Sequence, residues 1–199
     1  MAPSPTSDIL VASARDLFAE RGYERTTLAQ VAGAAGVLTG SLYHFFPSKS
    51  KLLEAVLESY LDGLDPVVMA PAFARSDDPI EQVFEVLADY RGRVLSTKFA
   101  YRCPIGSLAL EIANEDERAC KLVDENFAAW KAAIQSRFEL ARTRFAKGVD
   151  GAALAALALT VMEGAVMQAA VQRSIEPFDL SISQFRNYVN SLTKKGTHA

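Results

Sequence analysis

The chain has 199 residues, of which 50% are apolar and 23% are charged, a balance typical of globular proteins with one large domain or two smaller ones. Its net charge of −3 argues against non-specific coating of nucleic acid, and its two cysteines are too few for a disulfide framework or a zinc site. The start, "MAPSPTSD", does not resemble a secretion signal and no apolar run predicts a membrane span, so we expect a cytoplasmic protein.

Apolar residues recur at helical spacing along the whole chain, and alternation of the strand type is hard to find, so we predict an all-α fold. A first helix covers residues 9–18 and stops at Gly22. Thr27 is expected to cap a short helix, Gly36 to form a tight turn, and a second short helix to span residues 39–45.

The rest of the chain predicts a longer helix capped by Ser48, a connection at residues 66–79, and a helix that starts at Asp78-Pro79. The later predictions are helices at 105–113, 116–146, 152–173 and 182–193, with a loop at 174–181. In total we expect about nine to ten helices. They divide into a helix-turn-helix domain at residues 1–47 and a ligand-binding and dimerisation domain at residues 48–199.

Residues 27–49 have the chemistry that a DNA-reading helix-turn-helix requires. Val37 after the turn is expected to set the angle between the helices, and close helix packing is permitted by the small side chains of Ala29, Ala32, Gly33, Ala34 and Ala35. The second helix begins with small residues, so its front can reach base edges in the major groove. Leu42, Phe45 and Phe46 are predicted to face the core, and Tyr43 and His44 to face outward.

The run "TTLAQVAGAAGVLTGSLYHFFPSKSKLLEAVL", preceded by "LFAERGYER", resembles the DNA-binding part of the TetR/AcrR family of bacterial transcriptional repressors. The resemblance implies a homodimer, a double-stranded DNA operator as partner and a helical core that binds a small effector. It also implies two sets of DNA contacts. Thr39 and Gly40 would lie nearest the bases, and the phosphates would be contacted by Thr27, Ser41, Tyr43, His44 and Lys49.

Leu38 departs from the family pattern, in which Ser or Thr is common at this position. A leucine can neither cap the second helix nor bind a phosphate. Either Thr39 takes over the cap, or Leu38 makes an apolar contact with a thymine methyl group. The departure bears on the operator sequence rather than on the DNA-binding role.

The segment "CPIGSLALEIANED" at residues 103–116 resembles the C-terminal domain of the LmrA/YxaF-like branch of the family, which implies a small apolar or aromatic effector. The alanine-rich helix at 152–173 is either part of a dimer interface or a core helix of one subunit. Apolar residues on the middle helices either line an effector pocket or only fill the core, and Tyr90, Tyr101, Glu163 and Gln168 would orient a ligand. The candidate ligand-binding residues are Phe84, Phe99, Cys103, Phe127, Trp130, Met162, Val166 and Met167.

Cys103, beside Arg102, is either a buried inert residue or a thiol that reacts with electrophilic effectors. No nucleophile and base, phosphate-binding loop or metal-ligand spacing is visible, so we predict neither an enzyme nor a cofactor or metal. The leading hypothesis is a repressor that an effector releases from a palindromic operator. The alternative is a helical protein-interaction module that keeps the helix-turn-helix fold without binding an operator.

Overall fold

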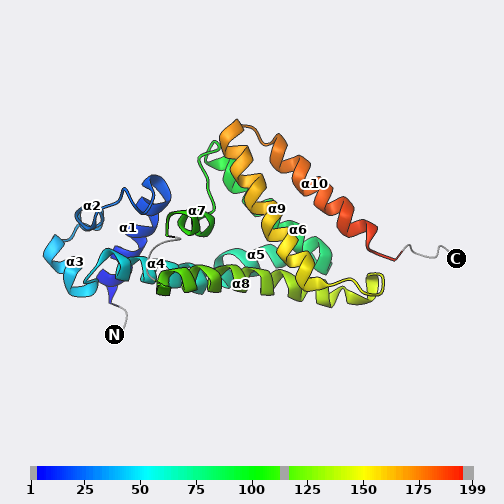
Figure 1. The fold of residues 1–199 in the computed structure, drawn as a ribbon, viewed down its shortest axis with the longest axis horizontal. Coiled ribbons are helices and arrows are strands. Elements are labelled where there is room, and N and C mark those ends of the chain that lie inside the picture. Colours follow the sequence, from blue (N-terminus) through cyan, green and yellow to red (C-terminus); the bar gives the residue numbers. More distant parts are fainter. Residues whose placement is uncertain (1–3, 113–116, 195–199) are drawn as a thin grey trace. The chain divides into compact units, whose positions relative to one another are not determined.

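The computed structural model describes residues 4–112 and 117–194, and within them it is all-helical, which confirms the predicted fold class (Figure 1). The described part contains ten α-helices and two short helical segments. They are α1 (Pro5–Arg21), α2 (Leu28–Ala34), α3 (Thr39–Phe45), α4 (Lys49–Gly63), the π-helical η1 (Leu64–Met69), α5 (Ala70–Phe73), α6 (Pro79–Ser96), α7 (Pro104–Glu111), α8 (Glu117–Leu140), the 3₁₀ segment η2 (Arg142–Arg144), α9 (Gly151–Gln172) and α10 (Glu176–Ser191).

The chain forms two compact units. The first unit combines Met1–Gly63 with Pro104–Phe127, and the second combines Leu64–Cys103 with Ala128–Ala199. The functional division at residue 47 that we expect from the sequence concerns roles rather than compactness, and it stays a prediction.

Local capping chemistry defines α1 and α2, and a glycine turn follows α2. The Ser4 hydroxyl accepts from the Ser7 N–H at the start of α1, and Gly22 ends that helix with φ of +87°. Thr27 and Gln30 form a reciprocal capping box at the start of α2. Gly36 follows with φ of +69°, a conformation that glycine adopts without steric cost. The predicted stop, cap and turn are therefore confirmed.

The first unit has a small core made by one face of each helix. The buried faces of α1 and α4 consist of Leu10, Ala14, Leu17 and Phe18 and of Leu52, Leu53, Val56 and Leu57. In α2, Val31 and Ala32 are buried, whereas Gly33 and Ala34 are exposed. Our expectation that the whole row of small residues serves close helix packing is therefore wrong, because only Ala32 of residues 32–34 lies at the contact.

The predicted connection at residues 66–79 is wrong over its first half, because η1 and α5 are helical. Pro66 lies in the π-helical segment η1, which continues α4 with an altered hydrogen-bond pattern, and Pro71 lies in the first turn of α5, which needs no N–H from a proline. The helix start at Pro79 is confirmed, since the Asp78 carboxylate accepts from the Ile80 N–H at 2.8 Å.

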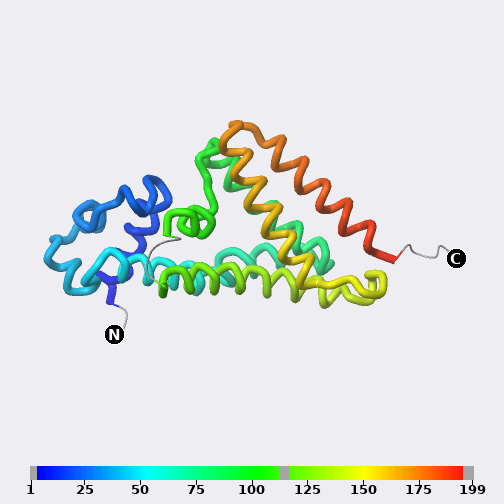
Figure 2. The backbone as a smooth tube through the Cα atoms, viewed as in Figure 1, coloured from blue at the N-terminus to red at the C-terminus, as the bar shows by residue number. Residues whose placement is uncertain are grey.

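The second unit is built on α6, α9, α10 and part of α8, and Figure 2 shows α9 and α10 as neighbouring helices that run in opposite directions. α10 begins at Glu176, six residues before the predicted start, because Pro177 suits a first helical turn. α8 ends at Leu140, before the predicted end at Ala146, and Phe145 instead pairs with Thr193. Residues 113 and 116, two other predicted helix ends, lie outside the described residues.

Candidate functional site

The surface of α3 carries most of the predicted DNA contacts. Leu42 is fully buried beneath the helix, and Phe46 is buried just after it. The opposite face is exposed and consists of Thr39, Gly40, Ser41, Tyr43 and His44. This orientation confirms that Tyr43 and His44 face outward. Such a short helix can enter a major groove. The small residues at its start can then approach base edges, and the aromatic hydroxyl and the imidazole further along can contact phosphates.

The start of α3 has no side-chain cap. Leu38 occupies the cap position with its side chain 80% exposed, and the Ser41 N–H donates to the Leu38 carbonyl oxygen at 2.9 Å. Thr39 is already the first helical residue, so the alternative in which Thr39 provides the cap is wrong. Of the two alternatives for Leu38, an apolar contact with DNA is the one that remains.

Thr27 has a structural role besides the predicted phosphate contact. Its hydroxyl lies 3.2 Å from the Gln30 N–H and from the Gln30 Oε1 atom, and that oxygen accepts the Thr27 N–H at 2.8 Å. The side chain is exposed. The capping box therefore holds the Thr27 hydroxyl at the surface at the start of α2.

Lys49 is held by residues that precede α2 in the chain. Its Nζ atom lies 4.2 Å from the centroid of the Tyr23 ring and donates to the Glu24 carbonyl oxygen at 3.2 Å. Lys51, two residues further on, instead pairs with Glu54 at 2.7 Å. Lys49 is thus oriented by an aromatic ring and a carbonyl, neither of which carries a negative charge that a phosphate would have to displace.

Half of the predicted ligand-binding residues lie together in the second unit. Phe84, Trp130, Met162 and Val166 are buried in one apolar cluster, and Phe99 packs against its edge. Trp130 donates its ring N–H to the Tyr90 hydroxyl at 3.1 Å. Phe127 belongs to the first unit and is half-buried.

Cys103 belongs to a set of polar residues beside this apolar cluster. Its side chain is buried, and its thiol forms a hydrogen bond with the Glu163 carboxyl group. Burial raises the pKa of Glu163, and this hydrogen bond opposes the rise. Burial also raises the pKa of both Tyr90 and Tyr101, so their hydroxyl groups are neutral donors and acceptors. Arg102, the cation that we considered as a partner for the thiol, is exposed.

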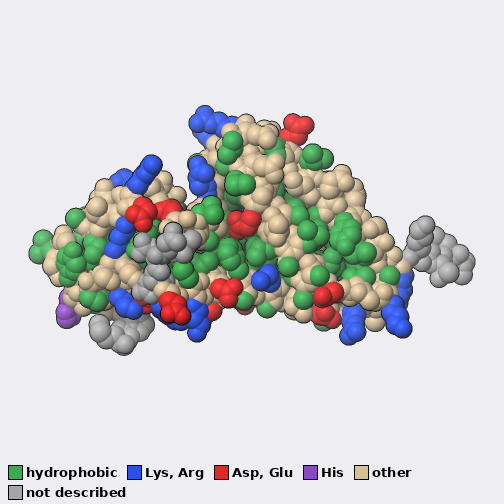
Figure 3. All heavy atoms as spheres, viewed as in Figure 1, with side chains coloured by type: hydrophobic (Ala, Val, Ile, Leu, Met, Phe, Trp, Pro, Cys, Tyr) green, Lys and Arg blue, Asp and Glu red, His purple; other side chains and the backbone are tan. Residues whose placement is uncertain are grey.

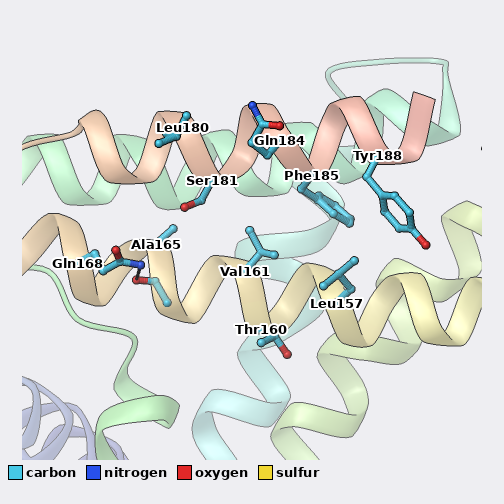
Figure 4. A pocket seen from close by; sticks show the side chains of 11 residues that line it. Leu157, Thr160, Val161, Ala165, Gln168, Leu180, Ser181, Gln184, Phe185 and Tyr188 are labelled. Carbon is cyan, nitrogen blue, oxygen red and sulfur yellow. Dashed lines mark hydrogen bonds between the residues drawn. The ribbon is translucent and has the colours of Figure 1, made fainter. Parts of the chain in front are cut away.

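Met167 and Gln168 lie elsewhere on α9. The Met167 side chain is 59% exposed, and Gln168 lines a groove between α9 and α10 (Figure 4). The groove has a volume of about 580 Å³, and apolar side chains from both helices, including Leu157, Leu180 and Tyr188, form much of its wall. Figure 3 shows hydrophobic side chains gathered over these two helices. The groove therefore lies on the outside of the internal apolar cluster, with which it shares Ala165 and Phe185.

α9 is long and apolar enough to cross a membrane by length and composition alone, and 39% of its most apolar window is buried. Its buried face consists of Leu154, Ala155, Ala158, Met162, Ala165, Val166 and Ala169. The helix thus contributes to the core of the second unit with one face and leaves a second apolar face exposed. Among residues 4–112 and 117–194, no group of three or more His, Cys, Asp or Glu side chains could hold a metal ion.

A tight turn followed by a short exposed helix on a three-helix core defines a helix-turn-helix DNA-binding protein. The chain belongs to the TetR family of bacterial regulatory proteins: the model of the family's N-terminal region matches residues 10–56, and that of the LmrA/YxaF-like regulator C-terminal domain matches residues 79–184. Both resemblances noted in the sequence are therefore confirmed. TetR-family proteins are DNA-binding regulators without enzymatic activity, so the chain is a transcriptional regulator and not an enzyme.

Individual proteins agree with this assignment. The uncharacterized HTH-type transcriptional regulator Rv0196 of Mycobacterium tuberculosis is 33% identical over 186 residues, which cover 89% of this chain and 91% of that protein. The HTH-type transcriptional repressor KstR2 of Mycolicibacterium smegmatis is 45% identical over 62 residues, 31% of this chain and 30% of its own. A TetR regulatory protein from Rhodobacter sphaeroides has the same fold, with a TM-score of 0.82 at 21% identity over 92% of this chain and 97% of that chain.

Sequence reasoning missed the support of Lys49 by Tyr23 and the hydrogen bond between Cys103 and Glu163. Both pairs are far apart in the chain, and no local pattern connects their members. The only signal for Glu163 was that it is the single charged residue of an otherwise uncharged helix.

Proposed function

We propose that the chain is a repressor that binds a palindromic operator as a homodimer and is released by a small, largely apolar or aromatic effector. The exposed face of α3 is the observation that carries the proposal of DNA binding. The predicted DNA-contacting residues of α3 lie on this face, outside the core, and the buried Leu42 anchors the helix beneath them. A DNA-binding regulator acts where the chromosome is, so we propose the cytoplasm as its location. The known repressor KstR2 among its relatives supports repression rather than activation.

The exposed apolar face of α9 and α10 supports a homodimer. Val171 and Leu180 are 76% and 61% exposed, and Leu157, Met167 and Tyr188 are also exposed. A monomer that leaves these side chains in water forgoes about 25 cal/mol for each Å² of apolar surface that a partner would cover. Two readers joined this way can contact half-sites one helical turn, about 34–36 Å, apart.

The internal apolar cluster supports the proposal that the effector is small and largely apolar or aromatic. Phe84, Trp130, Met162 and Val166 provide apolar and aromatic surface, and Tyr90, Tyr101 and Glu163 provide polar atoms beside it. Such a combination suits a small apolar ligand with a few directional contacts. The Cys103 thiol is buried and bonded to an acidic group, so we favour reversible binding over covalent capture of an electrophile.

The DNA-binding proposal is tested by selecting an operator from random DNA with the full chain and measuring affinity at several salt concentrations. Tyr43→Ala and Lys49→Ala should weaken binding to every selected sequence, and each lost phosphate contact should reduce the salt slope by about one. Lys51→Ala is the matched control, since Lys51 pairs with Glu54 on the same helix. An equal loss in all three variants, or none in the first two, would contradict the assignment.

The dimer is tested by sedimentation of Leu180→Glu and Val171→Glu, which place a charge on the exposed apolar face. We expect monomers that no longer bind the operator at concentrations where the unmodified chain does. Leu110→Glu is the control, because Leu110 is 83% exposed on α7, outside α9 and α10. If a stable dimer forms but no DNA sequence is selected, the protein-interaction module is the better description.

A further inference from the structure

Glu163 has an unsatisfied oxygen inside the second unit. Its Oε1 atom is buried and accepts no hydrogen bond from any residue that the structure describes. The Cys103 thiol bonds to the same carboxyl group, so the group has one partner and one vacant acceptor position. Burial of an acceptor without a donor is unfavourable, and native proteins seldom retain it without a functional reason.

Within residues 4–112 and 117–194, Glu163 also forms no ion pair. It is the only charged residue among the 22 of α9, and its neighbours Met162, Ala165 and Val166 are buried apolar residues. An apolar residue at position 163 would extend that buried surface. A carboxyl group here therefore does not serve packing, and a partner from outside the chain accounts for it better.

Two tyrosines interact electrostatically with this carboxyl group. The rings of Tyr90 and Tyr101 lie 6.3 Å apart, and Glu163 and Cys103 both influence the ionisation of the two tyrosines. The ring N–H of Trp130 is already bonded to the Tyr90 hydroxyl, so it is not a donor for Glu163. Arg93, the nearby cation, lies 5.9 Å from the Tyr90 ring and forms no ion pair with Glu163.

We propose that the effector carries a protonated amine with at least one N–H on an apolar, aromatic body, and that this N–H donates to Glu163. The inference rests on the proposed function, because it names the chemistry of the effector that the internal cluster binds. A carboxyl group with a free acceptor is matched by a charged donor, and aromatic rings beside it favour both the cation and its apolar body. The raised pKa of Glu163 agrees with a site whose cation is supplied by the ligand.

The first test uses three probes that share one body: phenylbutylamine, phenylbutanol and phenylbutyltrimethylammonium. Trp130 is the single tryptophan of the chain and lies in the cluster, so its fluorescence reports binding. A charge-assisted hydrogen bond predicts that the amine binds about ten-fold or more tightly than the alcohol. The quaternary ion has a charge but no N–H, so it should bind more weakly than the amine.

Glu163→Gln should remove the preference for the amine, so that the amine and the alcohol bind within about two-fold of each other. Glu176→Gln is the matched control, because Glu176 is an exposed glutamate of the same unit, and it should retain the preference. The inference is wrong if the amine binds no more tightly than the alcohol, if no probe binds, or if Glu163→Gln keeps the preference.

A second measurement separates a binding role from a structural one. If the role of Glu163 is to bind a ligand, Glu163→Gln should raise the melting temperature of the ligand-free protein. The change removes a buried carboxylate that lacks a full set of partners. If Glu163 holds the fold together, the same change should lower it, and the inference fails. The result also shows whether the variant is folded for the probe measurements.

The results that would contradict the repressor proposal differ from those that would contradict the proposed amine. Amine binding that depends on Glu163 but leaves a selected operator occupied would support the ligand chemistry and contradict release by an effector. Operator binding that is released only by neutral compounds, irrespective of residue 163, would support the repressor and contradict the amine.

Discussion

The Lys49 ammonium lies over the face of the Tyr23 ring, 4.2 Å from its centroid, although 25 residues separate Lys49 from Glu24, the neighbour of Tyr23 to which it also bonds. Tyr23 is itself buried and packs edge-to-face on Phe18 of α1. The position of the proposed phosphate-binding cation thus depends on the core of the first unit. A change beneath the reader surface can therefore alter DNA binding without touching DNA.

Tyr23→Leu should weaken operator binding by a few-fold, because Lys49 loses the ring that orients it and must be ordered when DNA binds. In a Lys49→Met background the same change should have a smaller effect, and the double-mutant cycle measures this coupling. Independent, additive losses would mean that Tyr23 affects DNA binding only through the stability of the unit.

Leu38→Ser should stabilise the protein, because serine can cap α3 where Leu38 makes no side-chain hydrogen bond. We expect the free energy of unfolding to rise by about 1 kcal/mol, measured in urea. Leu38→Ala is the matched control, since it removes the exposed side chain without adding a cap. Both variants should also shift the preferred operator sequence if Leu38 contacts a thymine methyl group.

Gly22→Ala should destabilise the first unit. Gly22 has φ of +87°, and a Cβ atom there would lie 2.9 Å from the Glu111 Oε1 atom. That carboxylate also accepts the Glu24 N–H at 3.0 Å, so its displacement would cost a second contact. We expect a loss of about 1 kcal/mol or more in thermal unfolding.

Gly33→Ala is the control for that experiment. Gly33 lies in α2 with nothing within 4 Å of an added Cβ atom, and alanine is the better helix former. Stability should stay the same or rise by up to about 1 kcal/mol. A loss at Gly33 as large as the loss at Gly22 would refute the explanation by backbone conformation and close contact.

The pair between Arg91 and Asp179, which joins α6 to α10, predicts a pH dependence. The Arg91 guanidinium bonds both oxygens of Asp179, at 2.7 and 2.9 Å, and lowers the pKa of that carboxyl group. A lowered pKa contributes stability that is present above the pKa of the unfolded state, about 3.9, and is lost as the pH falls through the folded value. The contribution is small, because both side chains are over 40% exposed.

Asp179→Asn should therefore destabilise the protein by at most about 1 kcal/mol at neutral pH. The difference from the unmodified chain should shrink as the pH falls below about 4. Urea unfolding at several pH values measures it. A difference that stays constant down to pH values at which the carboxyl group is protonated would show that the ion pair is not its source.

The sequence alone determined the helices and the turn of the helix-turn-helix, because the signals for them are local. A glycine with positive φ, a threonine cap and the spacing of apolar residues each act within a few residues, so Gly22, Thr27, Gly36 and the bounds of α3 could be predicted. Prolines misled the prediction at Pro66, which lies in a π-helical segment that continues α4, and at Pro177, which suits the first turn of α10.

Only the tertiary structure decided which surfaces are buried and which side chains meet. Met162 and Met167 are five residues apart on one helix, yet one is fully buried and the other is exposed in the α9–α10 face. Likewise, no pattern in the chain connects Glu163 with Cys103, or Lys49 with Tyr23, because these contacts form only when distant helices pack. Helical periodicity is a property of neighbouring residues, whereas burial and partnership depend on the whole fold.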